Sequence, residues 1–183
     1  MLGRRTFLTL IAAGVTAPAA NAHTLYNQWV VFRQKHLLIG SHRKDPPTYD
    51  LAVEVVEILE HLLPEASARA ARAPHPERLA SLLATGQMFL SVMSRDQASA
   101  MKAGSGEFAP YGAIPLTYVE DLGSCLLVSH RDFPPRHAWL VTAALREVGF
   151  GYAPSEAVAG LERHPGAQAM IDGTVFEDMP DGK

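Results

Sequence analysis

A buried strand and an amphipathic helix follow one another in residues 37–64, which read LLIGSHRKDPPTYDLAVEVVEILEHLLP. The apolar run Leu37–Ser41 has the length of a short buried strand and ends in a glycine turn. After a polar loop that closes with two prolines, apolar residues recur at the spacing of a helix that faces a core. We expect Thr48 to cap this helix and Pro64 to end it. The stretch therefore predicts the first strand–helix unit of an α/β domain.

The same alternation continues along the rest of the chain. Further strands are expected at 66–73, 88–93, 114–119 and 123–130, and further helices at 76–86, 94–103, 134–149 and 155–161. We expect Leu37–Ser41, Met88–Met93 and Gly123–Val128 to lie inside the sheet, because their residues are mostly apolar. Connections of helical length between strands favour a mostly parallel sheet with helices on both faces. The predicted fold is a single three-layer α/β domain over residues 23–172, followed by a polar tail at 173–183.

The chain begins with the pattern of an export signal. Arg4 and Arg5 are followed by a short apolar run and by the small-residue cleavage pattern Ala20-Asn21-Ala22. Twin arginines in this position resemble a Tat signal, which exports proteins that are already folded. We therefore expect a signal peptide at 1–22, a mature chain that starts at His23 and a periplasmic location. An uncleaved membrane anchor is the alternative, although the apolar run is short for a full span.

Composition narrows the class of protein further. Hydrophobic residues make up 48% of the chain and charged residues 19%, which are values of a globular domain. A formal net charge of −3 argues against nucleic acid as a partner. Cys125 is the only cysteine and stands in an apolar run, so we expect a buried structural thiol rather than a reactive one. Export in the folded state agrees with a chain that cannot form an internal disulfide.

Four passages along the chain carry a resemblance to a known family. They are the strand, loop and helix start at 38–49, LASLLATGQ with MFLSV at 79–92, the helix-like segment 133–145, and His164-Pro165-Gly166-Ala167. In this order they resemble periplasmic solute-binding proteins of the TAXI type, which serve TRAP transporters. The resemblance implies the fold of one lobe of a type II periplasmic binding protein.

This chain also departs from that family. Family members have two lobes and trap the ligand in the cleft between them, whereas the segment 96–125 is too short here to hold a second lobe. The glycine-rich ligand loop of the family is replaced by the polar loop 42–47. The chain therefore resembles a solitary first lobe, and the resemblance does not imply ligand capture between two closing lobes.

Ligands of open parallel sheets bind at the carboxyl ends of the strands, where helix N-termini point their N–H groups outward. The predicted fold gathers polar residues from the first strand, the first helix and the third strand at this edge. They are Ser41, His42, Arg43, Thr48, Tyr49, Ser94 and Arg95. Lys44, His75, His130 and Arg131 are further polar residues assigned to the same edge. Arginines and helix dipoles favour a small anionic or zwitterionic ligand; a solvated loop edge and a protein-docking surface are the alternatives.

Neither catalysis nor metal binding finds support in the sequence. The serines near strand ends stand in no G-x-S-x-G motif. Glu54, Glu57 and Glu60 share the polar side of the first predicted helix, as a solvated face would. The eight histidines do not show the spacing of a helical metal site. We therefore expect a protein that is not an enzyme, with no catalytic residues, no metal and no cofactor.

Two functions remain open at this point. The first is a periplasmic solute-binding-like domain that binds or senses a small polar or anionic ligand for a TRAP-type transporter. The second is a non-enzymatic accessory subunit that docks on a membrane-associated or exported protein complex. The segment Tyr26–Phe32 is rich in aromatic and β-branched residues and would serve the second function as a docking strand. An edge strand or a lid on the core is the alternative interpretation of this segment.

Overall fold

The computed structural model describes residues 35–152 and 158–179. In this part of the chain, five strands form one sheet in the order β2-β1-β3-β5-β4. The strands are β1 (Leu38–His42), β2 (Arg69–Ala73), β3 (Leu90–Ser94), β4 (Leu116–Asp121) and β5 (Cys125–His130). β1 pairs in parallel with β2 and β3, whereas β5 is antiparallel to both of its neighbours, β3 and β4. The predicted interior positions of β1, β3 and β5 are confirmed.

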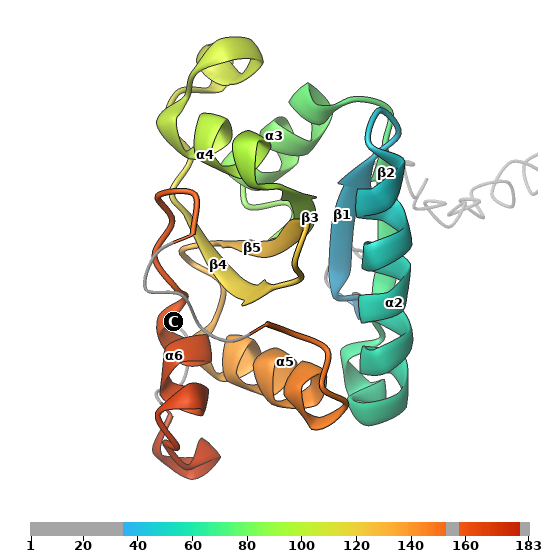
Figure 1. Ribbon diagram of the computed structural model, residues 1–183, viewed down its shortest axis with the longest axis vertical. Helices are drawn as coiled ribbons and strands as arrows, with labels where there is room; N and C mark the ends of the chain where they lie inside the picture. Colours follow the sequence, from blue (N-terminus) through green and yellow to red (C-terminus); the bar gives the residue numbers. More distant parts are fainter. Residues whose placement is uncertain (1–34, 153–157, 180–183) are drawn as a thin grey trace, which may run out of the picture.

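Helices cover both faces of this sheet (Figure 1). α2 (Pro46–Leu62) and α5 (Pro135–Glu147) pack on one face, in a cluster with Ile39, Leu90 and Leu127. α3 (Pro76–Ala84) and α4 (Arg95–Ala103) pack on the other face, against Met93 and Leu126. α6 (Pro165–Ile171) lies against α5. Three short 3-10 turns, Pro64–Ala66, Gly106–Tyr111 and Phe176–Asp178, complete the described elements. The result is the predicted three-layer α/β domain.

The outer edge of β4 is covered by the chain that leads into α6. Tyr118 pairs with Arg163 in a parallel bridge, in which Tyr118 N donates to Glu162 O and His164 N donates to Tyr118 O. The guanidinium of Arg163 also lies 4.6 Å from the centre of the Tyr118 ring. This covering agrees with the complete burial of β4, since an uncovered edge strand would expose its backbone groups.

Two local predictions are wrong. Thr48 is not the N-cap of α2: Asp45 is, and the two prolines after it fill the first helical positions, where a missing N–H is tolerated. The helix predicted at 155–161 does not form where the structure describes it, because Val158 and Leu161 instead close a turn through an antiparallel bridge. Ala159 and Gly160 have φ of 54° and 70°, which is left-handed backbone and cannot continue an α-helix.

The ends of the chain are described only in part. The predicted signal peptide at 1–22 and the segment Tyr26–Phe32 lie outside the described residues. The stretch predicted to be a polar tail is described as far as Met179, and it packs against α5. There Trp139 Nε1 donates to Thr174 O at 3.0 Å, and Met179 is buried.

Candidate functional site

The topology places the predicted site residues of β1 and β3 at a switch point of the sheet. β1 leads through α2 to β2 on one side, and the chain then returns through α3 to β3 on the other side of β1. Ligands of open α/β sheets bind where the strand order reverses in this way, outside the carboxyl ends of the strands. α2 begins shortly after β1, and α4 begins directly after β3, so the two helix starts belong to this same edge.

Ser41 and His42 end β1 with buried polar atoms. Ser41 is 0% exposed and His42 is 1% exposed. Neither Ser41 Oγ nor His42 Nδ1 has a hydrogen-bond partner among the residues that the structure describes. The other ring nitrogen of His42, Nε2, lies 3.0 Å from Oε1 of Gln97 on α4. A buried polar group without a partner costs about 1–3 kcal/mol, so these two atoms are the natural candidates for ligand contacts.

The two side chains point to opposite faces of the sheet, because successive residues of a strand alternate. Ser41 shares its face with Ile39, which packs in the cluster that contains the core side of α2. His42 shares its face with Leu38, which packs in the cluster of α3 and α4. The carboxyl end of β1 therefore offers one polar atom beneath each of the two helical layers.

Arg95 has a structural partner that the sequence did not reveal. Its Nη2 donates to both carboxylate oxygens of Asp121, at 2.8 and 2.9 Å, and Asp121 is 5% exposed. Nε and Nη2 also donate to Gly123 O. Asp121 ends β4 and Gly123 stands in the turn to β5. Arg95 thus ties the end of β3 to the β4–β5 turn, and this pairing reduces its availability for an anionic ligand.

Most donors at the helix N-termini are also used within the chain. The first two residues of α2 are prolines and have no N–H, and Thr48 N donates to Asp45 O at 3.2 Å. At the start of α4, Ser94 Oγ accepts from Gln97 N. In α3, the pKa of Glu77 is lowered. The main cause is a hydrogen bond from the backbone of Glu77 itself, and the nearby His75 and Lys44 add to it. These contacts weaken the case for a bare anion held by helix dipoles.

The other predicted residues contribute less to a ligand site. Thr48 Oγ1 donates to Asp45 O at 2.7 Å, and the Arg72 guanidinium lies 4.5 Å from the centre of the Tyr49 ring. Arg43 is exposed, and its backbone N donates to Ala73 O. Among the seven predicted ligand-binding residues, Ser41 and His42 therefore have buried side-chain atoms without a hydrogen-bond partner in the described structure.

The assignment of His130 and Arg131 to this edge is wrong. β5 is antiparallel to β3, so its last residue, His130, lies at the amino edge of the parallel strands, where His130 N donates to Phe89 O. The start of β5 with Cys125 lies at the carboxyl edge instead, paired with Ser94. The expected burial of Cys125 is confirmed. Burial raises the pKa of its thiol, Asp45 adds to this rise, and Arg95 opposes it.

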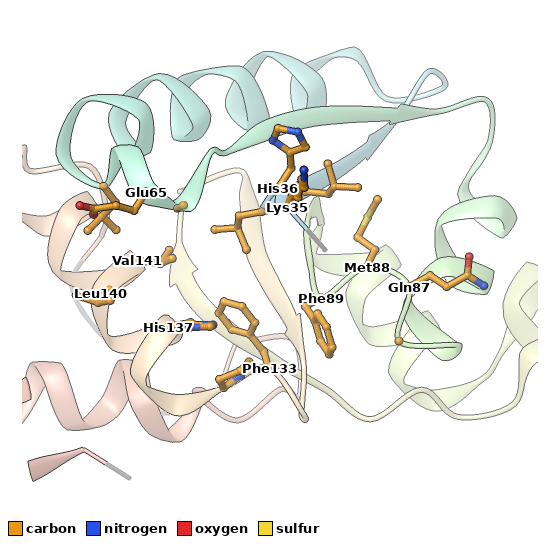
Figure 2. Close-up of a pocket in the computed structure, with 16 residues that line it drawn as sticks. Lys35, His36, Glu65, Gln87, Met88, Phe89, Phe133, His137, Leu140 and Val141 are labelled. Atoms are coloured by element: carbon orange, nitrogen blue, oxygen red, sulfur yellow. The ribbon is translucent and has the colours of Figure 1, made fainter. Parts of the chain in front are cut away.

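A cavity at the amino edge was not predicted. Its volume is about 670 Å³, and it is bounded by residues before β1 and β3, by residues that follow α2 and by the start of α5 (Figure 2). Leu37, Leu63, Met88, Phe133 and Leu140 are among its apolar lining residues. No local pattern could have indicated this cavity, because its walls come from segments far apart in the sequence.

Polar side chains also line the cavity. Figure 2 shows Lys35 and His36 on one side, with Phe133 and His137 across from them. Glu65 and Gln87 are the other charged or amide side chains of the lining. An apolar cavity of this size with a few polar groups has the general properties of a binding pocket.

Comparison with known proteins adds no assignment, since no protein-family model and no curated protein matches the chain. Within residues 35–152 and 158–179, histidine, cysteine, aspartate and glutamate form no group of three or more that could hold a metal ion. None of the helices in the described ranges combines the length and hydropathy that a membrane crossing requires.

Proposed function

We propose that this protein is a periplasmic solute-binding-like domain that binds or senses a small polar ligand, anionic or zwitterionic, possessing both hydrogen-bond donors and acceptors. The binding position is the carboxyl edge of the sheet between β1 and β3. The observation that carries the proposal is the pair of buried, unpartnered atoms at the end of β1, Ser41 Oγ and His42 Nδ1, at the switch point of an open α/β sheet. The resemblance to TAXI-type receptors supports a role beside a TRAP-type transporter.

The hydrogen-bonding capacity of the two atoms defines the ligand chemistry. With Gln97 Oε1 as acceptor, His42 Nε2 carries the ring proton and Nδ1 is left as an acceptor. The Ser41 hydroxyl can donate. Because the two atoms lie on opposite faces of the sheet, a ligand that contacts both carries its acceptor, such as a carboxylate, and its donor, such as an ammonium or hydroxyl group, at separate positions that span the end of β1. Amino acids and hydroxy acids with a side chain between these groups have this combination.

The single-lobed fold limits the affinity. The described domain has no second lobe to exclude water from this edge, so the ligand's own polar groups give up hydrogen bonds to water when they bind. Such bonds contribute about 0.5–1.5 kcal/mol each. We therefore expect a dissociation constant no tighter than about micromolar, unless a partner chain covers the site.

Isothermal titration calorimetry with a panel of amino acids and hydroxy acids tests this proposal. Ser41→Ala should weaken binding by about tenfold, which corresponds to 1.4 kcal/mol. Ser91→Ala is the matched control, because Ser91 is also a buried strand serine but its Oγ already donates to Gly40 O at 3.0 Å. That variant should keep the affinity of the wild type. Equal binding by wild type and Ser41→Ala would contradict the site, and no binding across the panel would favour the docking-subunit function.

Export is tested separately. If Arg4 and Arg5 form a Tat signal, replacement of both by lysine should hold the precursor in the cytoplasm. The wild-type protein should then appear in periplasmic extracts as a chain that starts at His23. Unchanged export of the double-lysine variant would rule out the Tat route.

A further inference from the structure

We propose that the cavity at the amino edge of the sheet binds a small monocarboxylic acid with an apolar body, such as a medium-chain alkanoic acid. The apolar body lies in the cavity, and the carboxylate lies at its rim beside Lys35. This site is separate from the proposed ligand site, which is at the opposite, carboxyl edge. Apolar and polar residues occupy different parts of the lining, and this division defines the ligand.

The inner part of the cavity is apolar. The lining residues Met88, Phe133 and Val141 are at most 5% exposed, so they form the floor. The Phe133 ring packs against the ring of Phe89, another lining residue, with ring centres 6.1 Å apart. The volume of about 670 Å³ lies within the range of about 300–1,000 Å³ that is typical of small-molecule sites. Burial of an apolar body against this floor is favourable, because it removes apolar surface from water.

The rim of the cavity is polar. Its charged, amide and imidazole side chains include Lys35, Glu65, Gln87 and His137, and all four residues are exposed. A ligand that fits this arrangement has one apolar end and one polar end. The polar end stays at the rim in contact with water, so binding does not require the burial of a charged group.

Lys35 determines which charge the polar end of the ligand carries. Among the described lining residues it is the only lysine or arginine, and none of the ion pairs in the described structure involves it. Figure 2 shows the acidic residue of the lining, Glu65, well apart from Lys35. The Lys35 ammonium is therefore available to a carboxylate. A single carboxylate fits best, because Glu65 would repel a second one in the same cavity.

Isothermal titration calorimetry of the full chain with octanoate, 1-octanol and butanoate tests this site. Octanoate should bind roughly two- to fivefold more tightly than 1-octanol, because only the carboxylate pairs with the exposed Lys35. Butanoate has the same carboxylate but a shorter apolar body, and each buried methylene changes the affinity about fourfold. Butanoate should therefore bind at least about tenfold more weakly than octanoate.

Three results of this titration would overturn the proposal. They are no binding of octanoate at millimolar concentration, binding of 1-octanol at least as tight as that of octanoate, and equal binding of butanoate and octanoate. The last result would show that only the carboxylate is recognised, as expected of a site outside the apolar cavity.

A pair of lysine variants tests the position of the carboxylate. Lys35→Gln should remove the preference for octanoate over 1-octanol and leave the binding of 1-octanol unchanged. Lys102→Gln makes the same change at a lysine of α4, outside the lining, and should keep the preference. A preference that survives in Lys35→Gln, or that is lost in both variants, would overturn the assignment. Lys35 is exposed, so its replacement should not prevent folding.

A pair of glutamate variants tests the position of the apolar body. Leu140→Glu places a carboxylate in the lining and should weaken octanoate binding by at least about tenfold. Ala143→Glu introduces the same residue on the same helix at a position outside the lining, and should leave the binding unchanged. Equal binding by both variants would overturn the site. Circular dichroism verifies that both fold, and the lysine pair remains the test if Leu140→Glu does not.

A second copy of the chain is the other occupant to be tested. Analytical ultracentrifugation with and without octanoate measures the oligomeric state. A monomer that binds octanoate in the order given above would support the proposal. A dimer that octanoate dissociates would assign the cavity to an interface between two copies and would overturn it.

Discussion

At the carboxyl edge of the sheet, Arg95 is held by Asp121, and the buried Glu120 is held by Arg146 and Arg163, whereas the amino edge surrounds an apolar cavity. The charged residues of the carboxyl edge join the ends of β3 and β4 to each other and to α5. Polar residues at a sheet edge are thus not automatically ligand groups, because most of them here stabilise the fold. The candidate site rests on the unpartnered atoms of two consecutive residues, Ser41 and His42, at the switch point; Arg163 Nη2 is a further buried atom without a partner in the described structure, but it lies beside β4 and away from this point.

The largest expected effect concerns the buried pair at the carboxyl edge. Glu120 is 0% exposed, and Arg146 Nε and Nη2 each donate to it at 2.9 Å. Arg146→Met should lower the free energy of unfolding by about 3–5 kcal/mol, because a buried carboxylate loses its main partner. Urea denaturation measures this loss.

The control for this prediction is an exposed ion pair. Arg69 and Glu60 pair with side chains that are each 48% exposed. Arg69→Met should therefore cost only about 0–1 kcal/mol. Losses of similar size for Arg146→Met and Arg69→Met would show that charge does not hold the carboxyl edge together.

The next largest effect is the difference in stability change between alanine variants of the two buried strand serines. Ser91→Ala removes a hydrogen bond to Gly40 O and should destabilise the protein by about 0.5–1.5 kcal/mol. Ser41→Ala removes a buried hydroxyl without a partner in the described structure, and should stabilise the ligand-free protein by about 1–3 kcal/mol. Thermal or urea unfolding of both variants measures the difference. Destabilisation of equal size in both would remove the main support for the ligand site.

The next prediction concerns His164 and the dependence of the free energy of unfolding on pH. Burial lowers the pKa of His164 below 6.5, although hydrogen bonds to the backbone of Phe133 and Arg131 oppose the shift. His164 Nδ1 accepts from Gly166 N, so protonation of this nitrogen would break the cap of α6. His164 binds a proton more readily in the unfolded chain than in the folded protein. The contribution of neutral His164 to stability is therefore fully present above pH 6.5, and it is lost as the pH falls from 6.5 through the lowered pKa of His164 in the folded protein.

The slope of this loss is at most about 1.4 kcal/mol per pH unit. His164→Asn can still cap α6 but does not titrate. The wild type should therefore lose more stability than the variant between pH 7.5 and pH 5, as measured by urea denaturation across this range. Parallel pH profiles for the two proteins would contradict the assignment.

The smallest effect concerns Tyr49. Its ring lies under the Arg72 guanidinium, a contact that contributes about 0.5–1 kcal/mol at an exposed site. Tyr49→Leu should cost about this amount, and Tyr49→Phe should cost nothing measurable. If the hydroxyl of Tyr49 contacts the ligand, Tyr49→Phe will instead weaken binding in calorimetry while stability stays unchanged.

Several elements were predicted correctly because their signals are local. The apolar runs of β1, β3 and β5 indicated interior strands, and the spacing of Ala52, Val55, Val56 and Leu59 indicated the buried side of α2; all four residues are buried. The exposed positions of Glu54, Glu57 and Glu60 follow from the same period. Such signals act over a few residues, since burial of one face dictates which positions must be apolar.

The partners of the candidate site residues could not be predicted in this way. Asp121 is 26 positions from Arg95, and nothing in either local sequence links the two residues. The end of β5 was placed at the wrong edge because an apolar strand has the same pattern in both directions. Position 166, in the motif His164-Pro165-Gly166-Ala167, accepts only glycine, because a Cβ there would collide with the backbone of Pro135.

Local sequence was thus sufficient for the elements, for their buried faces and for the class of fold, because short-range periodicity and turn residues depend on neighbours along the chain. The tertiary structure alone decided which polar residues are partnered, which edge each strand end reaches, and where a cavity lies. These properties depend on segments that meet only after folding. Ser41 and Ser91 both end up fully buried on neighbouring strands, and only the folded structure shows that one has a hydrogen-bond partner and that the other has none in the described chain.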